Sequence, residues 1–143
     1  MLELRSTIWA MNSEEGSTDT LLSRIESIRN KIPIPIDIQN KLKESYPLKS
    51  IELLNLYRII QEAVQNTLKY AEASLIKISF EENQTGIHLV ISDNGKGISP
   101  GTLDGNGLRN MRYRCEQIGG SFELHPEANQ GTTIRCTLSH LSY

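Results

Sequence analysis

The sequence predicts an α+β protein, a two-layer α/β sandwich in which helices cover one face of a mixed, mostly antiparallel sheet. Apolar residues recur at helical spacing in three longer segments, besides a short one at the N-terminus, and alternate, or run together, in strand-length segments. The resulting order is helix, strand, helix, two strands, helix, two strands. Short turns join the later strands in pairs, which predicts antiparallel hairpins and a sheet covered on one side.

The N-terminal part is predicted to contain two helical segments. Residues 2–10 have a short helical pattern, so residues 1–12 are expected to be the end of a longer helix or a docking segment. Residues 12–18 are polar, contain glycine and are typical of a linker. Ser17 is a good N-cap for a helix with Leu21, Leu22, Ile25 and Ile28 on one face.

The middle of the chain is predicted to form a strand and then a long helix. Pro33 and Pro35 end the preceding helix, and Ile34, Ile36 and Ile38 alternate as in a strand. Pro47 precedes a helical pattern over residues 50–71. Its predicted core face consists of Leu53, Leu56, Tyr57, Ile60, Val64 and Leu68.

The C-terminal half is predicted to contain two hairpins and one helix. Strands at 75–82 and 87–92 form the first hairpin, and a polar, glycine-rich segment follows at 93–105. Strands at 121–125 and 132–139 form the second. A helix over 107–118 lies between them and ends at a glycine pair. Its core positions are Leu108, Met111, Cys115 and Ile118.

The composition is that of one ordinary globular domain. The chain has 143 residues, 38% of them hydrophobic, and a net charge of −2, so no global charge favours nucleic acid or membrane. No apolar run approaches the ~20 residues of a membrane-spanning helix. Cys115 and Cys136 lack metal or redox spacing and are expected to be reduced, packed thiols rather than a disulfide.

Three polar side chains lie on one stripe of the predicted long helix. Glu62, Asn66 and Lys69 are spaced four and three residues apart, which places them on the same side. An amide oxygen suits Mg²⁺, a carboxylate can hold a metal-bound or attacking water, and an ammonium can meet phosphate oxygens. The alternative is a solvated face with a Glu–Lys surface pair.

A carboxylate and two glycines follow the buried strand at residues 87–92. Asp93 can accept a hydrogen bond from the exocyclic amine of adenine and would repel the carbonyl oxygen of guanine. Gly95 and Gly97 permit close approach of a ligand to the backbone. The alternative is an ordinary Asp-Asn-Gly turn.

A second glycine pair, Gly105 and Gly107, opens the next helix, whose free N–H groups form a site for anions. Arg109 and Arg112 follow and either contact phosphate or are ordinary exposed arginines. The pattern is neither a dinucleotide fingerprint, because Asn110 replaces the third glycine, nor a P-loop.

With these three motifs in this order, the chain resembles the catalytic ATP-binding domain of bacterial sensor histidine kinases. That domain belongs to the superfamily of gyrase, Hsp90, histidine kinase and mismatch-repair ATPases, and the likeness covers residues 17–140. The resemblance implies a Bergerat-type ATP-binding fold. Among the histidine kinases, the chain is most similar to the subfamily paired with NarL/LuxR-type response regulators. The similarity lies in the sequence of residues 105–112 and in the short segment, eleven residues, between Asp93 and Gly105.

The resemblance implies a role for each matched residue. Asn66 would ligate Mg²⁺, Glu62 would support the metal's water or the attacking group, and Lys69 would act at the phosphates. Asp93 would read adenine, with Thr132 or Thr133 helping through water. The residues implied to bind nucleotide are Asn66, Lys69, Tyr70, Asp93, Gly95, Gly97, Ile98, Gly105, Asn106, Gly107, Leu108, Thr132 and Thr133.

The resemblance also implies partners. ATP would donate its γ-phosphoryl group to a histidine on the dimerisation and phosphoacceptor domain of the same kinase, for relay to a NarL/LuxR-type response regulator. Residues 3–11 look like the end of that domain's second helix. His88, His125 and His140 lack the acidic neighbour typical of an acceptor and are expected to be structural. The isolated domain is expected to be monomeric and cytoplasmic, whether or not the intact protein is anchored in a membrane.

Two other functions remain open at this stage. An anti-sigma-factor-type serine kinase shares the nucleotide-binding fold and needs no acceptor histidine. A nucleotide-binding interaction module would bind ATP without transferring phosphate. An ATP-driven clamp of the gyrase type is less favoured, because it needs further domains.

Overall fold

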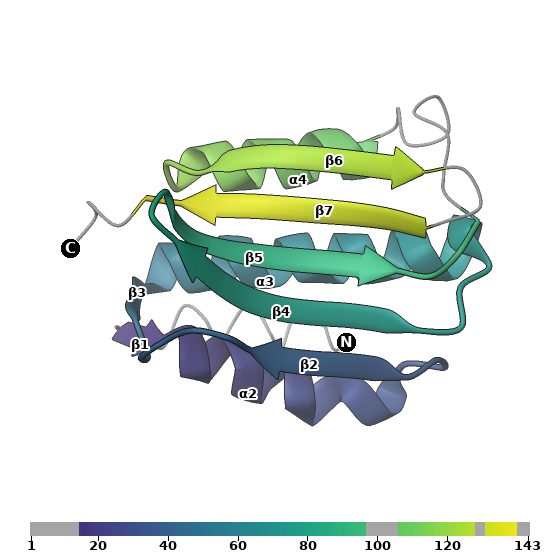
Figure 1. Ribbon diagram of the computed structural model, residues 1–143, viewed down its shortest axis with the longest axis horizontal. Coiled ribbons are helices and arrows are strands. Elements are labelled where there is room, and N and C mark those ends of the chain that lie inside the picture. Colours follow the sequence, from purple (N-terminus) through teal and green to yellow (C-terminus); the bar gives the residue numbers. More distant parts are fainter. Residues whose placement is uncertain (1–14, 97–105, 128–130, 140–143) are drawn as a thin grey trace.

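The computed structural model describes residues 15–96, 106–127 and 131–139. A five-stranded sheet with the order β2-β4-β5-β7-β6 forms one layer, and helices α2, α3 and α4 form the other (Figure 1). The elements are β1 (Glu15–Ser17), α2 (Thr18–Ile28), η1 (Arg29–Lys31), β2 (Ile36–Asn40), β3 (Pro47–Lys49), α3 (Ser50–Asn66), η2 (Thr67–Ala71), β4 (Ile76–Asn83), β5 (Gly86–Asp93), α4 (Asn106–Gln117), β6 (Ser121–Glu127) and β7 (Gly131–Leu138).

This architecture confirms the predicted α+β sandwich. β4 and β5 form an antiparallel hairpin, as do β6 and β7, and the two hairpins join where β5 pairs with β7. β2 adds to the edge of β4 in parallel, so the sheet is mixed. The sheet is therefore mixed as predicted, but the sequence pattern did not identify β2 as the parallel strand. Nor did it predict the two-stranded sheet that β1 and β3 form within the expected linker and before the long helix.

The core lies between the helices and the inner face of the sheet. The strands contribute alternate residues, including Ile78 and Phe80 of β4 and Leu89 and Ile91 of β5, all nearly inaccessible. Burial of one such side chain contributes about 1.5–3 kcal/mol. At the start of α2, Ser17 and Thr20 bond reciprocally, Ser17 N to Thr20 Oγ1 at 3.0 Å and Thr20 N to Ser17 Oγ at 3.3 Å, which confirms the predicted cap.

The predicted core face of the long helix is confirmed except at its end. Leu53, Leu56, Tyr57, Ile60 and Val64 are buried, but Leu68 is 40% exposed. The chain leaves the α-helix after Asn66 and makes a π-helical turn, η2, which ends at Glu72 in the left-handed region. A π turn contains more residues than an α turn, so the spacing that predicts Leu68 on the core face no longer applies there.

The expectation of reduced thiols is wrong in this structure, which joins Cys115 of α4 to Cys136 of β7 in a disulfide. Helix α4 packs behind the β6–β7 edge of the sheet (Figure 1). This packing brings the two Cα atoms to 6.3 Å, within the range that a disulfide spans. Both residues are buried. Their separation of 21 residues contains no signal of the pairing, which depends on the packing alone.

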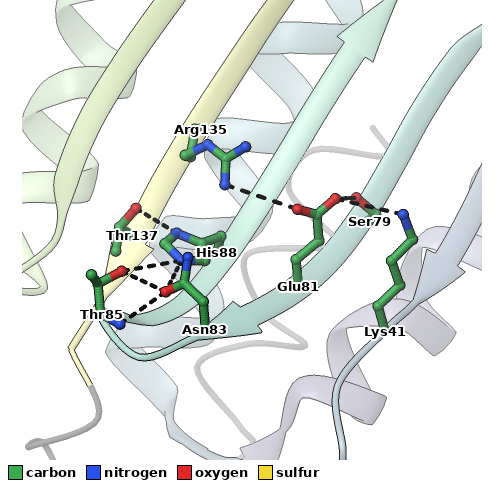
Figure 2. A network of polar contacts seen from close by, with 8 residues as sticks. All are labelled: Lys41, Ser79, Glu81, Asn83, Thr85, His88, Arg135 and Thr137. Atoms are coloured by element: carbon green, nitrogen blue, oxygen red, sulfur yellow. Dashed lines mark hydrogen bonds and ion pairs between the residues drawn. The ribbon is translucent and has the colours of Figure 1, made fainter.

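The face of the sheet opposite the helices carries a polar network (Figure 2). His88 of β5 is only 5% exposed, with Nδ1 2.8 Å from Thr137 Oγ1 and Nε2 2.9 Å from Asn83 Oδ1. Asn83 Oδ1 also accepts the Thr85 N–H, which supports this orientation of the Asn83 amide. Since an amide oxygen only accepts hydrogen bonds, Nε2 of His88 is the donor. Glu81 lies 3.9 Å from Arg135 and 3.8 Å from Lys41. These bonds support a structural role for His88.

A second polar contact secures the loop before β3. The Tyr46 hydroxyl donates to Glu82 Oε2 at 2.7 Å, and the Lys43 N–H donates to Glu82 Oε1 at 2.6 Å. The hydrogen bond to Glu82 is the main cause that raises the pKa of Tyr46 to about 12, with partial burial and the charges of Glu82 and Glu44 adding to it. Only the protonated phenol can donate this bond, so ionisation of Tyr46 opposes folding.

We expect this contact to make stability depend on pH in the alkaline range. The folded-state pKa lies above the unfolded value of about 10, so the contribution is complete below pH 10 and is lost as the pH rises towards 12. Tyr46→Phe should lower the free energy of unfolding at pH 8 and flatten its fall above about pH 10. Urea unfolding at several pH values measures both. Tyr113→Phe is the control, since that side chain is 61% exposed; an equal flattening there would contradict the assignment.

Candidate functional site

A pocket opens between the C-terminal part of α3, the end of β5, the start of β7 and helix α4. Elements far apart in the sequence meet here because α3 and α4 lie side by side against the sheet, where β5 pairs with β7 (Figure 1). The residues that line it are Ala63, Asn66, Thr67, Ile91, Ser92, Asp93, Met111, Thr132 and Ile134. Three of the predicted site residues, Asn66, Asp93 and Thr132, therefore share one pocket.

Asp93 is the last residue of β5, and both of its carboxylate oxygens are held. The Thr67 hydroxyl lies 3.2 Å from Oδ2, and the Gly95 N–H donates to Oδ1 at 2.8 Å. An ionised carboxylate only accepts hydrogen bonds, so Thr67 is the donor. Each oxygen keeps further accepting capacity for a ligand. Asp93 is half-buried and lines the pocket.

Asn94 anchors the turn after Asp93, a role that the sequence analysis missed. Its Oδ1 accepts the N–H groups of Ser74 and Leu75 at 2.9 and 3.0 Å, and its Nδ2 donates to Ser74 Oγ at 2.9 Å. The bonds tie the end of β5 to the segment before β4. The only sequence signal was the Asp-Asn-Gly triplet. It predicts that the Asn side chain bonds within its own turn, and it does not predict a bond to a segment twenty residues away.

Two glycines permit close backbone packing around Asp93. A Cβ at Gly95 would overlap the carbonyl group of Ala71, to which the Lys96 N–H donates at 2.9 Å. A Cβ at Gly131 would overlap the carbonyl oxygen of Asp93, and the φ of Gly131 is +96°. The position of Asp93 thus depends on glycine at both places, of which only Gly95 was singled out from the sequence.

Glu62, Asn66 and Gly107 lie together where α3 faces the start of α4. A Cβ at Gly107 would lie 3.0 Å from Glu62 Oε2 and 3.5 Å from both Oδ1 and Nδ2 of Asn66. Because glycine has no side chain, Gly107 leaves space in front of the Glu62 carboxylate and the Asn66 amide. Hard oxygen donors beside a helix N-terminus suit a cation bound together with an anionic ligand.

The structure separates the two threonines that were alternatives for the adenine site. Thr132 is buried and lines the pocket. Thr133 pairs with Ser92 across the β5–β7 ladder and lies on the opposite face of the sheet, because successive strand residues alternate. Sequence alone could not choose between them, since the choice depends on the register of β7.

Lys69 and Tyr70 lie on the π turn with exposed side chains, and neither of them lines the pocket. Arg109 and Arg112 are exposed on α4, and the Arg112 guanidinium lies 5.1 Å from the centre of the Phe122 ring. That contact supports an ordinary surface role for Arg112. Leu108 is half-buried and packs against the core and Ala71.

Some predicted site residues lie outside the described part of the chain. Gly97, Ile98 and Gly105 fall in the segment 97–105. Asn106 begins α4, but only its backbone is described. Among the residues that the structure describes, no three His, Cys, Asp or Glu side chains cluster as a metal site, and no helix is long and apolar enough to cross a membrane.

Known proteins with similar sequences include bacterial sensor kinases. DegS of Brevibacillus brevis, a signal transduction histidine-protein kinase/phosphatase, is 34% identical over 83% of this chain and 31% of its own length. The sensor histidine kinase LiaS of Bacillus subtilis is 31% identical over 94% of this chain and 36% of its own. The chain thus spans about a third of the length of these relatives.

Solved structures share the fold at lower identity. The ATP-binding domain of PrrB from Mycobacterium tuberculosis aligns with a TM-score of 0.69 and 20% identity, covering 87% of this chain and 95% of that one. The histidine kinase domain of the E. coli osmosensor EnvZ aligns with a TM-score of 0.68 and 20% identity, over 88% of each chain. These similarities confirm the predicted fold class.

A family model described as histidine kinase-, DNA gyrase B-, and HSP90-like ATPase matches residues 52–141, well over half of the chain. The matched range includes most of α3 and all the residues that line the pocket. By sequence, fold and the residues gathered at this pocket, the chain belongs to the family of histidine kinase-, DNA gyrase B- and HSP90-like ATPases.

Proposed function

We propose that this chain is the ATP-binding catalytic domain of a two-component sensor histidine kinase. It binds Mg–ATP and donates the γ-phosphoryl group to a histidine on a dimerisation domain of the same kinase, from which a NarL/LuxR-type response regulator receives it. The observation that carries the proposal is the meeting of Asn66, Asp93 and Thr132 in one pocket of an ATPase-family domain, with Gly107 beside Asn66. The sensor kinases among its relatives support the kinase class.

Asp93 is the residue proposed to recognise the base. Its carboxylate accepts a hydrogen bond from the exocyclic amine of adenine, while Thr132 lies beside it and supports the ring, directly or through water. Guanine presents a carbonyl oxygen at the same place, and two acceptors facing each other repel. The apolar residues of the lining, Ile91, Met111 and Ile134, suit a flat ring.

The residues around Gly107 fit a magnesium ion. Mg²⁺ prefers oxygen ligands, keeps several waters and is usually held by one or two protein groups plus the phosphates of the nucleotide. Asn66 is proposed as the direct ligand and Glu62 as the residue that holds a metal-bound water or assists the attacking group. When bound, the ion neutralises charge on the phosphate oxygens.

The other groups position the phosphates. The N–H groups at the start of α4, where Gly107 lies beside Asn66, are proposed to attract an anion. Lys69 is proposed to add a positive charge, and Tyr70 to border the phosphate side; Gly97, Ile98, Gly105, Asn106 and Leu108 are proposed to surround the nucleotide. In the transfer, a histidine nitrogen bonds to the γ-phosphorus as the bond to the bridging oxygen breaks and ADP leaves, so the domain contributes mainly position and charge.

The acceptor is proposed to lie on another domain. His88 is buried in the network on the outer face of the sheet, and His125 is exposed on that face, 3.3 Å from Glu123. Neither lines the pocket. The proposed site of action is the cytoplasm, where ATP and response regulators are found, and the isolated domain is proposed to be a monomer.

Calorimetric titration with ATP and GTP, each with and without Mg²⁺, tests the proposal. ATP should bind in a Mg²⁺-dependent manner and GTP should not. Asp93→Asn should weaken ATP binding about 10- to 100-fold, the amount that a hydrogen bond to a charged group contributes. Asp37→Asn, on the outer face of β2, is the matched control and should bind ATP normally.

Two results would overturn the proposed function. A folded chain that binds no ATP would be an interaction module and not a kinase domain. Transfer of phosphate to a serine of a partner protein, and not to a histidine on a supplied dimerisation domain, would indicate a serine kinase of the anti-sigma-factor type.

A further inference from the structure

We infer that Thr67 is a positioning residue that fixes the Asp93 carboxylate for adenine and thereby sets base selectivity. The inference rests on the proposed function, because it names the residue that controls its base-reading group. Thr67 is the first residue of η2, the π-helical turn, and lines the pocket. Its side chain is only 6% exposed, so its hydroxyl has little water to bond with.

The hydroxyl of Thr67 makes a bond that its place on a helix does not require. A threonine hydroxyl in a helix often bonds to the carbonyl four residues earlier. Here the Thr67 N–H keeps its helical bonds and donates to the carbonyls of Ala63 and Val64. The hydroxyl instead lies 3.2 Å from Asp93 Oδ2. The bond joins the helix that carries Asn66 to the strand that carries Asp93.

Two donors on different oxygens determine how the carboxylate is turned. The Gly95 N–H holds Oδ1 at 2.8 Å, and the backbone at Gly95 is itself held against Ala71. A single donor leaves a carboxylate free to turn about its terminal torsion, which has a broad energy profile. The second donor, on Oδ2, removes that freedom. A carboxylate fixed before the ligand arrives binds an amine at a lower entropic cost.

The test uses base selectivity, which general destabilisation of the domain would not change. Kd is measured by calorimetry for ATP and for purine riboside triphosphate, which lacks the 6-amino group, with wild type, Thr67→Val and Thr67→Ser. Valine has the shape of threonine but no donor, and serine keeps the donor. Thr67→Val should weaken ATP binding roughly tenfold and bring the two Kd values closer by a similar factor. Thr67→Ser should restore the wild-type ratio.

Thr137→Val is the matched control. It removes a threonine hydroxyl that lies 2.8 Å from His88 Nδ1 on the other face of the sheet. It should lower stability without changing the ratio of the two Kd values. If Thr67→Val does not fold, Thr67→Ala and Thr67→Ser form the test pair, because alanine also lacks the donor.

The outcomes separate this inference from the proposed function. If wild type prefers ATP over purine riboside triphosphate, and Thr67→Val or Thr67→Ala keeps the same preference, the role of Thr67 is overturned. The proposed function would still stand. Loss of preference in Thr67→Ser as well would also overturn it, since the hydroxyl would then not be the cause. Wild type that binds neither nucleotide would overturn the proposed function and this inference together.

Discussion

Gly131→Ala is expected to abolish ATP binding and to destabilise the domain by about 2–5 kcal/mol. Two costs add. The φ of +96° is strained for any residue with a Cβ, and the new Cβ would overlap the carbonyl oxygen of Asp93 and lie 3.0 Å from its carbonyl carbon. Both atoms that the Cβ would meet belong to the backbone of Asp93, so the clash can be relieved only if β7 and the end of β5 move apart. That movement displaces Asp93 from the pocket.

Gly119→Ala separates these two costs. Gly119 also has a positive φ, +76°, but a Cβ there meets no atom within 4 Å. It should therefore show only the backbone cost of about 1–2 kcal/mol, and ATP binding should be unchanged. Urea unfolding and calorimetry on both variants measure the difference. Equal destabilisation, or normal ATP binding by Gly131→Ala, would contradict the close contact of Gly131 with Asp93.

Asn66→Ala is expected to remove the Mg²⁺ dependence of ATP binding and to lower phosphoryl transfer to a supplied dimerisation domain at least about 100-fold. The amide is the proposed protein ligand of the ion and lies with Glu62 in front of Gly107. Without it, the charge on the phosphate oxygens is less well neutralised as the transferred group moves. ATP binding without Mg²⁺ should change little, because Asp93 and Thr132 remain in place.

Gln65→Ala is the matched control for Asn66→Ala. It removes an amide from the adjacent position of the same helix, but Gln65 is exposed and borders an apolar hollow on the other flank of α3. Its Mg²⁺ dependence and transfer rate should equal those of wild type. Calorimetry with and without Mg²⁺, and transfer of labelled phosphate, measure the two effects. Retained Mg²⁺ dependence in Asn66→Ala would show that the ion is held by other groups.

Much of the fold could be predicted because it depends on local periodicity. The apolar spacing of Leu53, Leu56 and Ile60 indicates a buried helix face, and the short turn before Gly86 indicates a hairpin. The pattern fails where the period changes. At Leu68, the π turn shifts the phase of the helix, and the side chain is exposed where an α-helix would have buried it.

The candidate site was predicted in part for the same reason. Glu62 and Asn66 lie on one stripe of a helix, so their proximity follows from helical geometry alone. Asp93 follows a buried strand, and its place at the strand end was also readable. The hydrogen bond from Thr67 to an Asp93 oxygen could not be predicted, because Thr67 lies 26 residues away in the chain.

The sequence by itself determined the order of the three main helices and of the five strands of the large sheet, most of the face that each buries and the three motifs, because these are properties of residues within a few positions of one another. Only the tertiary structure decided the parallel pairing of β2, the choice of Thr132 over Thr133 for the pocket and the pairing of Cys115 with Cys136. Each depends on strand register or helix packing. Both are set by the burial of the whole core, and no local pattern contains them.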